Sequence, residues 1–160
     1  MRISAHDLSV DLPPGWEGRI GLRSDEEPDA VAKPVLQAAT VPLPAERGDF
    51  GSGVVELLGP QDVFVSLVQY GDMEVGTRLF KDGARPRQLT ADQFRTNQLQ
   101  RWQPGQAGLQ VFFTDAGRAF CLYVVLGSFG ERVRLVGEVN RLLVGLRIGA
   151  GGRAGSPRVQ

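Results

Sequence analysis

Residues 109–126, LQVFFTDAGRAFCLYVVL, are the stretch of sequence that decides the fold. Its first half has apolar residues at every second position, Leu109, Val111 and Phe113, which is the period of a half-buried strand. The residues DAG at 115–117 predict a tight turn, and AFCLYVVL at 119–126 then forms a continuous apolar run. We therefore predict a β-hairpin whose second strand is covered on both faces.

A helix is predicted directly after this hairpin. Ser128 lies three residues before Glu131, the spacing of a capping box that satisfies free N–H groups of a first helical turn. Apolar residues then recur at helical spacing, at Leu135, Val139, Leu142 and Leu146, with Val136 and Leu143 beside them. We predict one long amphipathic helix over residues 131–148 that lies across a sheet.

The N-terminal half is predicted to supply most of the sheet. Strands are expected at residues 8–12, 16–22, 35–43 and 62–70, because apolar residues alternate or cluster there between proline- and glycine-containing breaks. Three strands before any long helix argue against a doubly wound βαβ pattern. Shorter elements are expected as a helix capped by Ser52, a strand over 77–80 and a helix capped by Thr90.

These elements predict an α+β fold, an antiparallel β-sheet covered by a long C-terminal amphipathic helix and by short helices. A chain of 160 residues is a natural size for one domain. We expect residues 1–148 to form that single domain. Residues 149–160, GAGGRAGSPRVQ, have little apolar content to bury and predict a flexible Gly-rich tail.

This order of elements resembles the PsbP-like fold family. The landmarks are VDLPPGWEGRI at 10–20, the hairpin through 111–126 and the helical segment 131–148. The resemblance implies an antiparallel sheet covered by helices. Members of that family serve as photosystem assembly subunits, a Ran-binding import factor, bacterial lipoproteins and chaperones of secreted effectors, and no catalytic residues carry over to this chain. The sequence also resembles small actinobacterial proteins.

The charge balance bears on the class of partner, and the cysteine content and the absence of long apolar runs bear on the cellular compartment. Lys+Arg and Asp+Glu both number 18, so no net charge attracts nucleic acid or an anionic membrane, and neither partner is expected. The single cysteine, Cys121, excludes an internal disulfide and fits a reducing compartment. The first residues carry no apolar signal region, and no apolar run approaches the ~20 residues that cross a bilayer. A cytoplasmic protein is therefore expected.

The search for catalytic and metal-binding residues predicts none. His6 is the only histidine, so a histidine metal cluster is excluded, and a His6–Asp7 general base is weighed against a solvated histidine. Cys121 lies among apolar neighbours, which favours a packing role over a nucleophile. No cofactor is predicted, because Gly149, Gly151 and Ala154 match a dinucleotide-binding spacing only after the last helix.

Two further groups of side chains have alternative interpretations. The acidic residues Asp25, Glu26, Glu27 and Asp29 predict a solvated loop rather than a calcium site, because a calcium loop needs alternating ligands and a glycine. Aromatic residues fit either the core or an exposed anchor patch, and these are Trp16, Trp102, Phe64, Phe112 and Phe129.

The densest basic group is the candidate partner-binding site, and it consists of Arg78, Phe80, Lys81, Arg85 and Arg87. We predict that these residues form a loop that contacts another protein. A phosphate or nucleic-acid surface is the alternative for the same group, which the zero net charge disfavours.

Three functions are carried forward. The first is a non-enzymatic protein-binding, assembly or chaperone-type module that holds another protein or a second copy of itself through a sheet face and long loops. The second is a structural subunit of a secretion or phage-derived particle. The third is a small-ligand pocket or enzyme site between the sheet and the C-terminal helix, for which the candidate polar residues are His6, Asp7, Arg118 and Tyr123.

Overall fold

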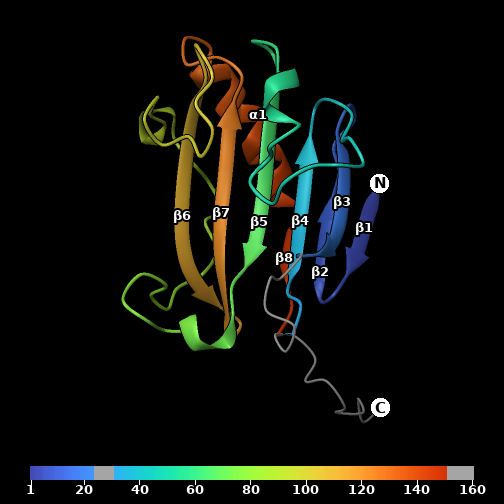
Figure 1. Cartoon of the computed structure of the whole chain (residues 1–160), viewed down its shortest axis with the longest axis vertical. Helices are drawn as coiled ribbons and strands as arrows, with labels where there is room; N and C mark the ends of the chain where they lie inside the picture. Colours follow the sequence, from blue (N-terminus) through green and yellow to red (C-terminus); the bar gives the residue numbers. More distant parts are fainter. Residues whose placement is uncertain (24–30, 151–160) are drawn as a thin grey trace.

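The computed structural model describes residues 1–23 and 31–150 of the chain. The larger of its two antiparallel sheets has the strand order β3 (Glu17–Leu22), β4 (Pro34–Ala39), β5 (Val63–Gln69), β7 (Arg118–Leu126) and β6 (Ala107–Asp115). The smaller sheet has the order β1 (Arg2–Ala5), β2 (Leu8–Asp11) and β8 (Leu146–Ile148). One α-helix, α1 (Arg132–Val144), is present in the described part, so the fold is α+β, as predicted (Figure 1).

The predicted hairpin is confirmed as β6 and β7. Asp115 pairs with Arg118 across the turn, and Ala116 and Gly117 between them have φ values of 55° and 73°. Two consecutive positive φ values are typical of a type I′ turn, whose twist matches that of paired strands. β7 lies between β5 and β6, and all nine of its residues are buried. This placement explains why the run at 119–126 is apolar on both faces.

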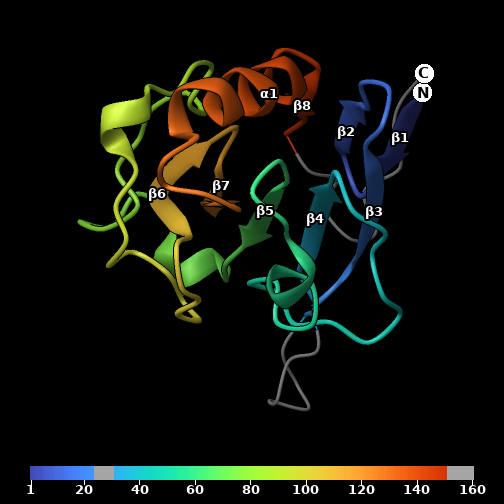
Figure 2. The ribbon, with the colours of Figure 1, turned by 90° about the horizontal axis from the view of Figure 1, so that it is seen from above.

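The two faces of the larger sheet are covered by different parts of the chain. On one face Val65, Leu67 and Leu122 pack in the same cluster as Leu135 and Val139 of α1. On the other face the buried cluster combines strand residues with loop residues, namely Phe64, Cys121, Tyr123 and Val125 with Leu43, Val54 and Val55. Figure 2 shows α1 along one side of the sheet and the loop after β4 on the other. The central strands β5 and β7 therefore present no exposed face.

The C-terminal helix is shorter than predicted. Leu135, Val139 and Leu142 are buried, as their spacing indicates, but α1 has 13 residues and ends at Val144. Leu146 belongs instead to β8, where it pairs with Val10 of β2. Gly145 follows the last helical residue and lies against β2: a Cβ on Gly145 would lie 2.8 Å from the Asp11 Cβ, and the Gly145 carbonyl accepts the Asp11 N–H.

Several shorter elements also differ from the predictions. The segment after Ser52 forms only the 3-10 helix η1 (Val55–Leu57), which has no side-chain cap. The predicted strand over 77–80 is absent: Phe80 is buried in the core, and the residues just after it form only a single-residue bridge to β6, at Asp82. The turn after β5 holds η2 (Asp72–Glu74), and the helix predicted after Thr90 is η3 (Ala91–Gln93). The Glu131 N–H donates to the Ser128 hydroxyl at 3.3 Å, but α1 begins only at Arg132.

The N-terminal residues and Gly149 make backbone contacts that the sequence did not predict. β1 was not predicted; it pairs with β2 through the turn His6–Asp7, whose φ values are 51° and 57°. Gly149, placed in the tail, donates its N–H to the Asp7 carbonyl at 2.7 Å. Residues 151–160 of that prediction lie outside the described part of the chain. Within the described part, no helix has the length and apolar character that crossing a membrane requires.

Candidate functional site

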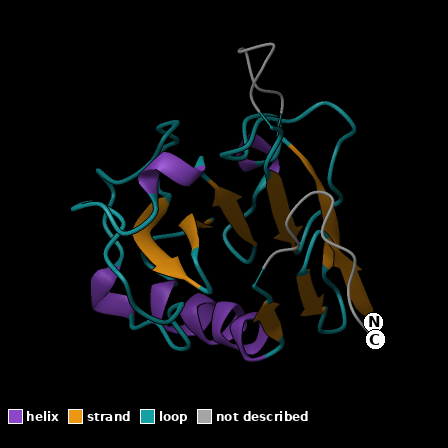
Figure 3. Cartoon of the chain, turned by 90° about the horizontal axis from the view of Figure 1, so that it is seen from below, coloured by secondary structure: helices purple, strands orange, loops and turns teal. Residues whose placement is uncertain are grey.

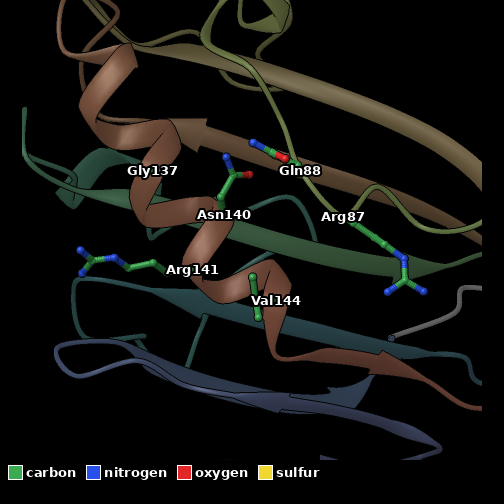
Figure 4. Close-up of a pocket in the computed structure, with 6 residues that line it drawn as sticks. All are labelled: Arg87, Gln88, Gly137, Asn140, Arg141 and Val144. Carbon is green, nitrogen blue, oxygen red and sulfur yellow. The ribbon is translucent and has the colours of Figure 1, made fainter.

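The candidate site is a groove between α1 and the long connection from β5 to β6. Figure 3 shows that connection mostly as loop, running beside α1. The hollow has a volume of about 290 Å³, is open to solvent and is lined by Arg87, Gln88, Gly137, Asn140, Arg141 and Val144 (Figure 4). We call these six residues the helix groove.

The two walls of the helix groove are fixed to each other by Asn140. Its Oδ1 accepts the Leu89 N–H at 2.8 Å, and its Nδ2 donates to the Leu89 carbonyl at 3.0 Å. The Asn140 amide thus pairs with Leu89 as a neighbouring strand would. The Leu89 side chain is itself buried in the core beneath α1. The groove is therefore already formed in the free protein.

The outer face of α1 has an unusual composition for a surface that faces water. Val133, Gly137, Arg141 and Val144 follow one another at spacings of four, four and three residues, which places them on one side of the helix. The side chains of Val133 and Val144 are exposed, with 77% and 70% of their surface accessible. Valine and glycine are both poorer helix formers than alanine, glycine by about 1 kcal/mol. We call these four residues the outer stripe.

Gly137 has no packing reason to be a glycine. A Cβ added to it would meet no atom within 4 Å outside its own helix backbone and immediate neighbours. By contrast, an added Cβ at Gly145, Gly108 or Gly127 would collide with neighbouring backbone or side-chain atoms. The missing side chain of Gly137 therefore leaves the groove open and does not serve a close contact within the fold.

The helix groove is positively charged. Its two charged lining residues are Arg87 and Arg141, and Figure 4 shows their guanidinium groups pointing away from each other on opposite sides of the hollow. Arg141 lies 3.8 Å from the Glu138 carboxylate, which is long for an ion pair. Arg85 lies in the same loop as Arg87, and the pKa of its guanidinium is lowered. Burial is the largest cause, and the charges of Arg87 and Arg147 add to it. The arginines around the C-terminal end of α1 thus repel one another.

The structure divides the basic group that the sequence indicated as partner-binding. Arg78, Lys81 and Arg87 are exposed, and only Arg87 lines the helix groove. Phe80 is buried, and its ring lies 4.9 Å from that of Tyr70 and 5.4 Å from that of Phe112. Arg85 is also buried. Phe80 and Arg85 therefore support the loop from inside, and they offer no side chain to a partner.

The other groove residues were not predicted, because they belong to no charge cluster in the sequence. The sequence does contain a pattern that could have indicated them. Val133 and Val144 are apolar residues outside the buried face of the helix, and Gly137 lies between them in the sequence. The aromatic alternatives are also resolved. Trp16 and Phe64 are buried, Phe112 and Phe129 are half-buried, and Trp102 is 67% exposed in the loop before β6.

The four polar residues proposed for a pocket beneath the helix do not converge there. The space between α1 and the sheet is filled by the apolar core. Tyr123 lies on the opposite face of the sheet, where its hydroxyl accepts the Gln100 N–H at 2.7 Å. His6 and Asp7 lie in the β1–β2 turn, and they meet Arg118 through their backbone carbonyls.

Arg118 joins the two sheets. Its guanidinium donates twice to Gln69 Oε1, at 3.1 and 2.7 Å, and once each to the carbonyls of His6, Asp7 and Gly149. A guanidinium has five N–H donors, so all are used. Burial lowers the pKa of Arg118, and a nearby charge on Asp7 opposes that change. With no donor left for a ligand, Arg118 is a structural residue.

Cys121 is a packing residue, as predicted. It is fully buried, and burial raises the pKa of its thiol to about 12. It is therefore a neutral thiol at physiological pH, and thiolate is the reactive form. In the described part of the chain, no three His, Cys, Asp or Glu side chains gather where they could hold a metal ion. The acidic residues Asp25, Glu26, Glu27 and Asp29 lie outside the described part.

This placement predicts that Cys121 resists alkylation in the native protein. At about pH 8, iodoacetamide is expected to modify the folded chain at least about a hundred times more slowly than the chain unfolded in urea, because modification must await opening of the core. Mass spectrometry over time measures both rates. Comparable rates in the two states would show that Cys121 is accessible in solution.

Comparisons with known proteins assign the chain to no family. It matches no protein-family model, no curated protein and no solved structure.

Proposed function

We propose that this protein is a non-enzymatic binding domain that holds another protein through the helix groove and the loop beside it. The observation that carries the proposal is the outer stripe, where two exposed valines flank an open glycine on a well-packed helix. A solvent-facing stripe without a partner has no need of such residues, since alanine or charged residues would stabilise the helix more.

The burial of the larger sheet restricts where a partner can bind. A module acting through a sheet face needs an exposed face, and β5 and β7 are buried on both sides. The loop from β5 to β6 and the outer face of α1 remain available. This arrangement supports a binding role for loop and helix together rather than for the central strands of the larger sheet.

The polar groups near the groove support binding rather than catalysis. The Asn140 amide is used by Leu89, and Arg141 and Arg87 offer the groove guanidinium donors for binding an anion. Cys121 is buried on the other side of the sheet, and His6 lies in the β1–β2 turn. The histidine and the cysteine thus lie away from the groove, and the Glu138 carboxylate beside it faces Arg141 at 3.8 Å.

We also propose that the fold is PsbP-like. The antiparallel sheet, the C-terminal helix across one face and the proline-glycine turn before Trp16 support this proposal. An experimental structure superposed on members of that family would test it, and a different strand order would contradict it.

Filling the groove is the direct test of the binding function. Gly137→Gln places a side chain into open space on a helix without touching the core, so the protein should fold normally and lose its partner. The partner is first captured from the native host with the wild-type protein and then purified. We expect the affinity of Gly137→Gln for the purified partner to be at least about tenfold lower than that of the wild type. The matched control is Gly71→Gln, which also enters open space but at the turn after β5.

The outcome that contradicts the proposal is equally specific. Partners retained identically by the wild type, Gly137→Gln and Gly71→Gln would show that binding occurs elsewhere on the molecule. Far-ultraviolet circular dichroism of each variant confirms that a loss of binding is not a loss of fold.

A further inference from the structure

We infer that the occupant of the helix groove is an extended acidic segment of the partner protein, with carboxylates at its two ends and a small apolar side chain between them. This inference rests on the proposed function and specifies the chemistry of the partner. The charge of the groove, the positions of its two arginines and its size support it.

The charge of the groove selects an anionic partner. Two of the six lining residues are arginines and none is acidic. Within the described part of the chain, Arg87 makes no side-chain hydrogen bond or ion pair, and Arg141 has only the Glu138 carboxylate at 3.8 Å. A guanidinium presents paired donors that match a carboxylate, so both arginines have unused capacity for this contact.

The positions of the arginines select an extended partner. Figure 4 shows Arg141 on one side of the hollow and Arg87 on the other, with Val144 between them and Gly137 about one helical turn before Arg141. A single anion cannot pair with both groups while they point apart. A segment lying across α1 meets one guanidinium at each end, and its middle then lies over Gly137 and beside Val144, where a small apolar side chain fits.

The groove fits a peptide better than the other anionic macromolecules. Single-stranded nucleic acid is held by aromatic residues on which bases stack, and no aromatic residue lines the groove. A volume of about 290 Å³ lies at the lower end of small-molecule pockets, and the hollow is open to solvent. Peptide side chains inserted from an extended backbone suit a shallow site of this size.

Model peptides test this inference directly. The probe is a fluorescent seven-residue peptide with a Leu-Ala-Leu centre and two glutamates at each end, compared with the same peptide carrying glutamines instead. Fluorescence polarisation should show at least about tenfold tighter binding of the glutamate peptide, and this preference should shrink in high salt because exposed charges are screened. A single-stranded oligonucleotide of equal charge serves as the competing macromolecule.

Variants assign the preference to the two arginines. Arg87→Gln and Arg141→Gln should each lower the affinity for the glutamate peptide by about threefold to tenfold. The affinity for the glutamine peptide should not change. Arg134→Gln is the matched control, since Arg134 is an exposed arginine on α1 that pairs with Glu131 and lies outside the groove. Gly137→Gln should lower the affinity for both peptides.

Each other result overturns the inference. Equal binding of the two peptides, no binding of either, an unchanged preference in Arg87→Gln and Arg141→Gln, or tighter binding of the oligonucleotide would exclude an acidic peptide as the occupant. The proposed function stands in those cases if Gly137→Gln still loses the native partner, so the two failures are distinguishable.

Discussion

Replacing Arg118 by methionine is expected to lower the free energy of unfolding by about 3–5 kcal/mol, because hydrogen bonds to a charged group contribute about 1.5–3 kcal/mol each and the Gln69 acceptor left behind is buried. Five donated bonds disappear together, and with them the connection among the β1–β2 turn, the end of β8 and Gln69 of β5. Methionine retains much of the apolar length of the side chain, so the loss comes mainly from the guanidinium.

Urea denaturation of Arg118→Met measures this effect, with Arg134→Met as the control. Arg134 is an exposed arginine of α1 whose ion pair with Glu131 is 3.4 Å long, and exposed pairs contribute at most about 1 kcal/mol. Hydrogen exchange should also show faster exchange in β1 and β8 of Arg118→Met. A decrease below about 1 kcal/mol would mean that water replaces the guanidinium without loss, and the sheets would not depend on it.

Phe80→Ala is expected to lower the free energy of unfolding by about 3 kcal/mol, since removing a buried phenylalanine side chain costs about 3–5 kcal/mol in a core. Phe80 packs edge-on against Phe112 of β6 and tilted against Tyr70, so it fixes the loop from β5 to β6 on the sheet. Its neighbour Leu79 is 59% exposed and provides the control. Leu79→Ala should change stability by less than about 0.5 kcal/mol.

Thermal and urea unfolding of the two variants decide whether Phe80 is a core residue or a surface residue. Equal stabilities of Phe80→Ala and Leu79→Ala would restore the interpretation of Phe80 as part of an exposed binding loop. The structure predicts a large difference between these adjacent positions, because their side chains point to opposite sides of the chain.

The parts of the fold that follow from local sequence were predictable. The hairpin of β6 and β7 has alternating and continuous apolar segments on either side of Asp115-Ala116-Gly117, and turn geometry alone then sets its register. The buried stripe of α1 is equally local, because Leu135, Val139 and Leu142 lie one helical turn apart. Such elements need no information from distant parts of the chain.

The elements that depend on distant contacts were not predictable. Leu146 continues the helical spacing of α1, yet it forms β8 because the N-terminal strand β2 offers it unpaired backbone groups. The turn His6–Asp7 has none of the usual glycine or asparagine, so β1 was missed. Phe80 appears in a basic loop by sequence, and only the aromatic cluster around it shows that it is buried.

The helix groove also depends on distant contacts. Asn140 and Leu89 are 51 residues apart, and their paired hydrogen bonds bring Arg87 beside α1. A sequence pattern contains no sign of that pairing. Gly137 and the valines of the outer stripe were not predicted as site residues either, because their position on the exposed face becomes clear only once the buried face is known.

The free energy of unfolding of Gly137→Ala tests most directly whether the glycine keeps the groove open while lowering the stability of the helix. An alanine side chain here meets no neighbour and improves helix formation, so stability should rise by about 0.5–1 kcal/mol. Loss of stability in this variant would mean that the fold itself requires the glycine, and the reason for assigning a partner to the outer stripe would disappear.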